Sequence, residues 1–198
     1  MSKLVRGTML VTVATFLTKF LGIVYVIPFN ELVGETGGTL YTFGYVPYNI
    51  LLSISTIGLP LAVAKMVSKY NALDDYYTGI RVFRTSIIFM VITGVVSFLI
   101  MFFSADFLAN QMITSKNETA ISVDDVALVM RMVSFALLII PAMSIFRGFF
   151  QGHQSMGPTA VSMLIEQIVR IIFLLVSTFL VVKVFKDTLA KAVGFATF

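Results

Sequence analysis

Glu166 and Arg170 carry opposite charges four residues apart in an otherwise apolar stretch, "VSMLIEQIVRIIFLLVSTFLVV" (161–182). In a helix this spacing places both side chains on one face, in the order favoured for an ion pair. At about 1.5 Å of rise per residue, Glu166 lies about 12 Å and Arg170 about 18 Å from Pro158, near the middle of a bilayer-spanning helix. We therefore expect both charges to face a protein interior or a hydrated cavity rather than lipid.

Three kinds of chemistry fit this pair. The first is a static ion pair within the helix. The second is a carboxylate that binds a coupling cation or proton, with Arg170 adjusting its proton affinity. The third is a cavity wall on which Arg170 binds an anionic substrate while Glu166 orients the guanidinium of Arg170 for binding. The spacing alone leaves all three interpretations open.

Two further apolar segments carry polar residues on one helical face. The face in the first segment ends near an embedded cation and consists of Thr8, Thr12, Thr15, Lys19 and Gly22. The face in the second segment consists of Tyr45, Asn49, Ser53, Thr56 and Pro60. Ser, Thr and Gly on membrane helices commonly serve close helix packing, so such a face can be purely structural.

Lys19 adds weight to the third interpretation of the pair. If the faces that carry Lys19 and Arg170 converge, the interior between them has a net positive charge. A positive, partly hydrated cavity of low dielectric favours an anion such as a phosphate.

The composition places the chain in a membrane. Hydrophobic residues make up 58% of its 198 residues and charged residues only 12%, whereas a soluble domain carries about a quarter charged residues. The absence of cysteine and the single histidine, His153, exclude disulfides, thiol catalysis and multi-histidine metal sites. No basic stretch interleaves with exposed aromatics, so we expect no nucleic-acid binding. No enzyme motif is found, so we predict no catalytic residue, cofactor or metal site.

Five segments are long and apolar enough to cross a bilayer core of about 30 Å, which takes about 20 residues. They predict an all-α, polytopic transmembrane helix bundle with helices over about 5–27, 43–66, 82–104, 126–146 and 159–182, and the start of a sixth over 190–198. The first apolar run is longer than the core of a signal peptide, so we interpret it as a retained helix. Because the chain stops within an apolar run, we expect residues 1–198 to be the N-terminal part of a longer transporter.

The distribution of basic residues predicts a cytoplasmic N-terminus, since cytoplasmic loops are enriched in Lys and Arg. With that orientation the inner regions hold Lys3, Arg6, Lys65, Lys69, Arg81, Arg84 and Arg147. The outer loops hold Lys116, Lys183, Lys186 and Lys191. The first outer loop, "NELVGETGGTL" (30–40), is predicted as a turn-rich connection without a basic residue.

Two blocks of the sequence resemble a known family. They are "VGETGGTLYTFGYVPYNILLSISTIGLPLAVAKMVSKYNAL" (33–73) and "RGFFQGHQSMGPTAVSMLIEQIVRI" (147–171). Both resemble the polysaccharide-biosynthesis exporters of Gram-positive bacteria related to stage V sporulation protein B. These belong to the multidrug/oligosaccharidyl-lipid/polysaccharide flippase superfamily, which includes the MurJ-type lipid II flippases. The resemblance implies two six-helix lobes around a central cavity, and this chain would supply most of the first lobe.

The match to lipid II flippases is incomplete at the basic positions. Those flippases carry a basic-x-Leu-Gly-x-x-Arg pattern in the first helix, and "KFLGIVY" (19–25) keeps Lys19 and Gly22 but has Tyr25 at the second basic position. They also place an arginine in the second helix, where this chain offers Asn49 and Ser53. Arg170 would then supply the charge from a different wall.

The function implied by the resemblance is a flippase for an undecaprenyl-pyrophosphate-linked sugar, such as the peptidoglycan precursor lipid II or a polysaccharide unit, in the bacterial plasma membrane. Lys19 and Arg170 would engage the pyrophosphate, and Glu166 would orient Arg170 or release it. The residues expected to contact sugar or peptide are Tyr45, Asn49 and Ser53. The expected partners are the lipid-linked substrate, membrane lipids, a coupling ion (H+ or Na+) and the remainder of the same transporter chain.

Two other functions stay open at this point. A cation-coupled multidrug exporter of the same superfamily would use Glu166 to bind its coupling ion. A non-transporting membrane scaffold would use all of the polar faces as packing surfaces between helices.

Overall fold

The computed structural model of the protein describes residues 3–116, 121–179 and 193. Within these ranges the regular structure is entirely helical, because a backbone in lipid must satisfy its hydrogen bonds within its own segment. The helices are α1 (Lys3–Val24), α2 (Val26–Thr56), α3 (Leu59–Ala72), α4 (Tyr76–Lys116), α5 (Val123–Ser134), α6 (Ala136–Gly152) and α7 (Met156–Phe179). The predicted all-α bundle is confirmed.

Among the described residues, five stretches are long and apolar enough to cross a membrane. They run over Val5–Glu31, Thr36–Ala72, Tyr76–Thr114, Val123–Gly152 and Met156–Val176. Their number agrees with the five predicted spans, although most begin earlier or end later than predicted. The predicted sixth helix, 190–198, lies outside the described residues except for Val193. Lys183, Lys186 and Lys191, which were assigned to an outer loop, also lie outside the described residues.

The predicted connection over 30–40 contains the break between the first and second spans, but it is a kink rather than an extended loop. Two helical segments, together labelled α2, meet at Gly34, with φ 68° and ψ −173°, a backbone region essentially restricted to glycine. The first candidate span ends at Glu31 and the second begins at Thr36. The flanking Phe29, Val33 and Leu40 are each at most 3% exposed in the main core. Burial of these side chains outweighs the low helix propensity of the glycines between them.

The second span is broken in its middle, where the sequence predicted one continuous helix. Helix α2 ends at Thr56, and Gly58 adopts a left-handed conformation with φ 69° before α3 begins. Pro60 occupies the first turn of α3, where a missing backbone N–H has no cost. The break separates α2 from α3 within one apolar stretch, Thr36–Ala72, that is long enough to cross a membrane.

Helix α6 packs closely against α3 and α4. A buried cluster of Val63, Val67, Met90 and Ile145 joins it to α3 and α4. The approach of α6 to α3 is close enough that a Cβ on Gly148 would overlap the carbonyl of Pro60. Close glycine-mediated contact is a common way for membrane helices to associate.

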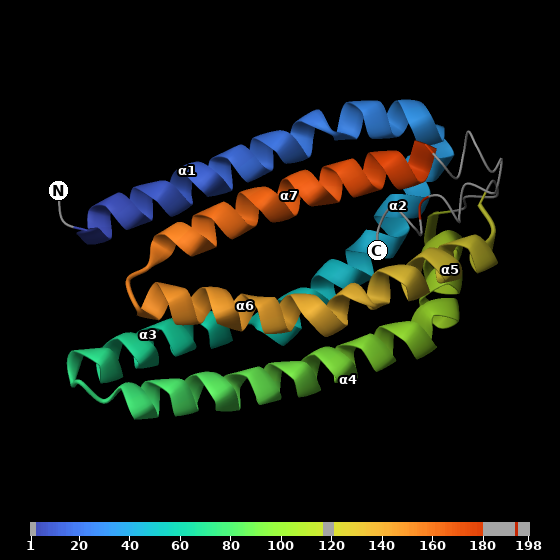
Figure 1. Ribbon diagram of the computed structural model, residues 1–198. Coiled ribbons are helices and arrows are strands. Elements are labelled where there is room, and N and C mark those ends of the chain that lie inside the picture. Colours follow the sequence, from blue (N-terminus) through green and yellow to red (C-terminus); the bar gives the residue numbers. More distant parts are fainter. Residues whose placement is uncertain (1–2, 117–120, 180–192, 194–198) are drawn as a thin grey trace.

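Helices α1 and α7 form a second layer and lie side by side over most of their length (Figure 1). Their contact uses small residues: Ala14 is buried, and a Cβ on Gly22 would lie 3.7 Å from Nε2 of Gln167. The start of α1, the α3–α4 turn and the α6–α7 connection lie at one end of the bundle, and the end of α4 and the start of α5 lie at the other (Figure 1).

Asp75 caps the N-terminus of α4 at the α3–α4 turn. The backbone N–H of Thr78 donates to its Oδ1 at 3.1 Å, and hydrogen bonds from the Thr78 side chain and backbone lower the pKa of Asp75. A carboxyl whose pKa is lowered by folding stabilises the fold at pH values above its ordinary pKa. This contribution is lost as the pH falls through the lowered pKa.

We expect Asp75→Ala to fray the first turn of α4, because the Thr78 amide loses its acceptor. Hydrogen exchange at neutral pH should show faster exchange of the Thr78 amide in this variant. Asp75→Asn keeps an acceptor oxygen and is the matched control. Equal exchange in Asp75→Ala and the native protein would contradict a capping role.

Candidate functional site

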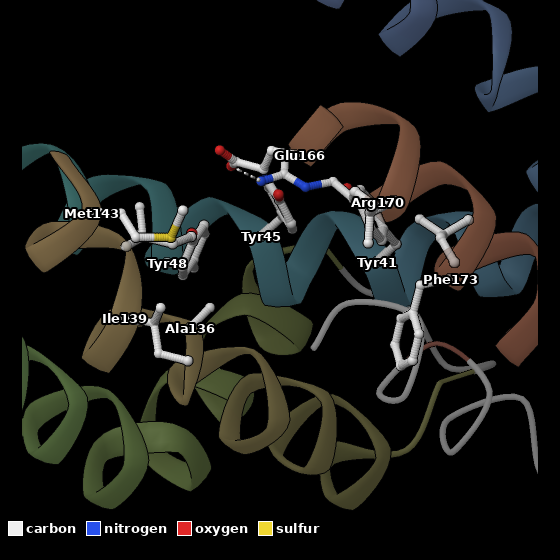
Figure 2. Close-up of a pocket in the computed structure, with 12 residues that line it drawn as sticks. Tyr41, Tyr45, Tyr48, Ala136, Ile139, Met143, Glu166, Arg170 and Phe173 are labelled. Atoms are coloured by element: carbon white, nitrogen blue, oxygen red, sulfur yellow. Dashed lines mark hydrogen bonds and ion pairs between the residues drawn. The ribbon is translucent and has the colours of Figure 1, made fainter. Parts of the chain in front are cut away.

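Helices α2, α6 and α7 enclose a cavity of about 390 Å³ (Figure 2). Helix α7 contributes residues at helical spacing: Glu166, Val169, Arg170, Phe173 and Leu174. Helix α6 contributes the apolar wall, which consists of Ala136, Ile139, Ile140 and Met143. The cavity therefore has a charged corner on α7 and an apolar wall on α6.

The third wall is a row of tyrosines on α2. The rings of Tyr41 and Tyr45 stack with centroids 4.8 Å apart, and Tyr45 and Tyr48 follow with centroids 5.1 Å apart. The hydroxyl of Tyr41 lies 3.3 Å from that of Tyr25. Tyr45 lies beside the Glu166–Arg170 pair in Figure 2. The row combines large apolar rings with hydroxyl groups that can donate and accept hydrogen bonds.

The charged corner consists of one carboxylate between two guanidinium groups. Nη2 of Arg170 donates to Oε1 of Glu166 at 3.2 Å, and Nη2 of Arg147 donates to Oε2 of the same carboxylate. Each of the three side chains is between 29% and 40% exposed. Two positive charges and one negative charge leave this cluster, Arg147–Glu166–Arg170, with a net charge of +1.

Arg147 reaches Glu166 from the neighbouring helix. It lies five residues before the end of α6, at Gly152, whereas Glu166 lies ten residues after the start of α7, at Met156. At about 1.5 Å per residue the two backbones differ in depth by about 7.5 Å, a gap that a long arginine side chain can span. The guanidinium therefore extends toward the middle of the bundle instead of toward the end of its helix.

The comparison with known proteins identifies the family. The family model described as "Polysaccharide biosynthesis protein" matches residues 4–197. The chain belongs to this family. The match agrees with the resemblance predicted from the blocks 33–73 and 147–171.

Three curated proteins of Bacillus subtilis (strain 168) are similar to this chain. The chain is 51% identical to "Lipid II flippase MurJ" over 197 residues, covering 100% of this chain and 36% of that protein. It is 30% identical to "Stage V sporulation protein B" over 176 residues, covering 87% and 32%. It is 29% identical to "Uncharacterized membrane protein YabM" over 178 residues, covering 90% and 31%. The chain thus spans about a third of the length of these relatives, and no solved structure matches it significantly.

The structure brings three of the six predicted site residues together: Tyr45, Glu166 and Arg170 all line the cavity. Asn49 and Ser53 are exposed and do not line it, and the Ser53 hydroxyl donates to the backbone carbonyl of Asn49. Each step of four residues turns about 40° around a helix axis, so these two residues rotate away from the cavity face. Tyr41 and Tyr48 lie on the other side of Tyr45 and take their place.

Lys19 is exposed on α1 and lies outside the cavity lining. The face of α1 that meets α7 carries Ala14 and Gly22 instead. The hydroxyls of Thr12 and Thr15, on the predicted polar face, donate to backbone carbonyls of their own helix. That pattern fits the structural interpretation of this face.

Sequence reasoning missed Arg147 as part of the site and assigned it to the cytoplasmic flank. A usable signal was present, since the α6–α7 connection is short and forces the two helices to be antiparallel neighbours. An arginine shortly before such a turn can reach an acidic residue deeper on the next helix. Arg131 of α5 pairs with Asp106 of α4 at 2.6 Å and lies over the ring of Phe102.

The described part of the chain, residues 3–116, 121–179 and 193, contains no group of three His, Asp or Glu side chains that could hold a metal ion. What the cavity offers is a cationic corner, hydroxyl groups and an apolar wall. Guanidinium groups bind phosphate oxygens with paired hydrogen bonds. The arrangement thus suits an amphipathic anion.

Proposed function

We propose that this chain is part of a flippase that moves an undecaprenyl-pyrophosphate-linked sugar across the bacterial plasma membrane. The substrate would be a peptidoglycan precursor such as lipid II, or a polysaccharide unit. Residues 1–198 would form the N-terminal lobe, and transport would proceed by alternating access between this lobe and the remainder of the transporter.

The observation that carries the proposal is the net positive corner at the edge of an amphipathic cavity. Arg170 would bind the pyrophosphate, since its guanidinium lines the cavity beside Tyr45. The tyrosine hydroxyls would hydrogen-bond the first sugar, and the apolar wall of α6 would accommodate the start of the prenyl chain. Lys19 as a second contact to the pyrophosphate stays a prediction, as do Asn49 and Ser53 as contacts to sugar or peptide.

The comparisons support the substrate class. The relative with 51% identity over the full chain is a lipid II flippase by its name. Because this chain spans only 36% of that protein, the substrate and the transport cycle belong to the proposal rather than to the family assignment.

The same cluster argues against a cation-coupled multidrug exporter. That function needs an embedded carboxylate free to bind H+ or Na+, and both oxygens of Glu166 are engaged by arginines. A coupling ion, if used, would then bind elsewhere in the transporter. A pure scaffold would have no need for a charged cavity, since burying charged groups is costly.

The proposed orientation has a cytoplasmic N-terminus. Basic residues gather near the N-terminus and the α3–α4 turn, which share one end of the bundle (Figure 1); they are Arg6, Lys65, Lys69, Arg81 and Arg84. The first turn of α5, at the opposite end, carries Asp124 and Asp125. This distribution favours the basic end as the cytoplasmic one.

The function can be tested by reconstituting the full-length protein into phosphatidylglycerol and phosphatidylethanolamine vesicles that contain fluorescent lipid II. We expect the labelled headgroup to become accessible from the opposite leaflet faster than in protein-free vesicles. Undecaprenyl pyrophosphate added in excess should compete. Transport of a cationic dye with ion dependence, and no movement of lipid II, would instead establish the exporter function.

A further inference from the structure

The two arginines of the cluster face different cavities. Arg170 lines the cavity of about 390 Å³ with the tyrosines, whereas Arg147 lines a second cavity of about 280 Å³ between α6 and α7. The second cavity is mainly apolar, with Met143, Phe146 and Phe150 in its lining. Met143 lines both cavities, so the two adjoin, and Glu166 joins the arginine of one to the arginine of the other.

The two arginines also differ in their exposure. Nη2 of Arg170 lies 3.2 Å from Oε1 of Glu166. The strongest charge-assisted hydrogen bonds are shorter, about 2.7–2.9 Å. Arg170 is 40% exposed and Arg147 29% exposed. Arg170 is thus the more exposed of the two arginines, and it lines the larger of the two cavities, where an entering anion would meet it.

We propose that Arg147 is a positioning residue, which retains the Glu166 carboxylate while Arg170 exchanges it for a phosphate oxygen of the substrate. This inference rests on the proposed function of the same cavity. When phosphate binds, Oε1 of Glu166 loses Arg170, but Oε2 keeps its hydrogen bond from Arg147. Glu166 is then never left as an unpaired charge in a low-dielectric site, which would oppose the exchange.

The same arrangement of Arg147 and Glu166 also promotes release of the substrate. Glu166 stays next to Arg170 after the exchange, because Arg147 holds it from α6. When the cavity changes shape during transport, the carboxylate can displace the phosphate again. Arg147 therefore sets the affinity of Arg170 for the anion without touching the anion.

The charge relationship can be tested with a double substitution in the full-length protein. Binding of undecaprenyl pyrophosphate in detergent is the measurement. Arg147→Gln should weaken binding about tenfold, because Glu166 then binds Arg170 without competition. The double variant Arg147→Gln, Glu166→Gln should return to within about threefold of the native affinity, since Arg170 is free and the cluster charge is again +1.

A different result is expected if the Arg147–Glu166 ion pair serves only to hold α6 against α7. Removing both partners would then leave binding as weak as in Arg147→Gln alone, and this outcome would overturn the proposal. Unchanged binding in Arg147→Gln would overturn it as well. If Arg147→Gln is not monodisperse, Arg147→Met, with and without Glu166→Gln, gives the same comparison, because methionine is also uncharged and fills more of the space of the arginine stem.

The matched control is Arg131→Gln, which also removes an arginine from an ion pair but lies outside both cavities. Its binding should equal that of the native protein. Arg170→Gln separates the two proposals. If Arg170→Gln binds normally, the proposed function of the cavity fails. If Arg170→Gln loses binding but the double variant does not recover, only the role of Arg147 fails.

Discussion

Replacing Arg170 with glutamine is expected to slow lipid II flipping by the full-length protein about a hundredfold. The substitution removes the guanidinium that lines the cavity and leaves Arg147 and Glu166 as a neutral pair. The cavity then loses both its direct phosphate ligand and its net positive charge. The measurement is the initial rate of flipping of fluorescent lipid II in vesicles with equal amounts of reconstituted protein.

Arg131→Gln is the control for the general effect of removing an embedded arginine. Arg131 forms an ion pair with Asp106 at 2.6 Å and is absent from the cavity lining. Its flipping rate should stay within about twofold of the native rate, as for a partly exposed ion pair away from the site. Equal losses in the two variants would show that Arg170 acts through stability, and a native rate in Arg170→Gln would exclude its role in substrate binding.

Replacing Gly148 with alanine is expected to destabilise the bundle by about 1–3 kcal/mol. The added Cβ would overlap the carbonyl oxygen of Pro60, which belongs to the backbone of α3 and cannot rotate away. The contact joins the two helices next to the break at Gly58, so separating them disturbs the packing of α6. The fraction of monodisperse protein that survives heating, measured by size-exclusion chromatography, reports the loss.

Gly157→Ala is the matched control because its Cβ would have no heavy atom within 4 Å. An alanine in a helix is favoured over glycine by about 1 kcal/mol, so the control should be neutral or slightly stabilising. The opposite signs at the two positions distinguish helix packing from helix propensity. If Gly148→Ala were as stable as Gly157→Ala, the close α3–α6 contact would not matter for stability.

Local chemistry made several features predictable from the sequence. Five membrane spans follow from the length of the apolar runs, since each helix in lipid satisfies its own backbone. The Glu166–Arg170 pair follows from its spacing, because residues four apart always share a helix face. Tyr45 was identified in the same way, from its place on the polar face of its segment.

The partners of these residues depended on how the helices pack. The sequence could place Tyr45, Asn49 and Ser53 on one face, but the rotation of α2 about its axis decided that only Tyr45 lines the cavity. The helical conformation on both sides of Gly34, in a segment predicted as a loop, follows from burial of its apolar side chains in the core. Neither the rotation of a helix nor the burial of a segment is set by local spacing.

Arg147 is the clearest example of a site residue that the sequence alone did not predict. By itself the sequence determined that an acid and a base would share a face deep in the last described helix. Only the tertiary structure decided that a second arginine, 19 positions before Glu166, would reach the same carboxylate and change a neutral pair into a cluster of net charge +1. The physical reason is that the i,i+4 contact is fixed by the geometry of one helix, whereas the Arg147 contact is fixed by the packing of α6 against α7.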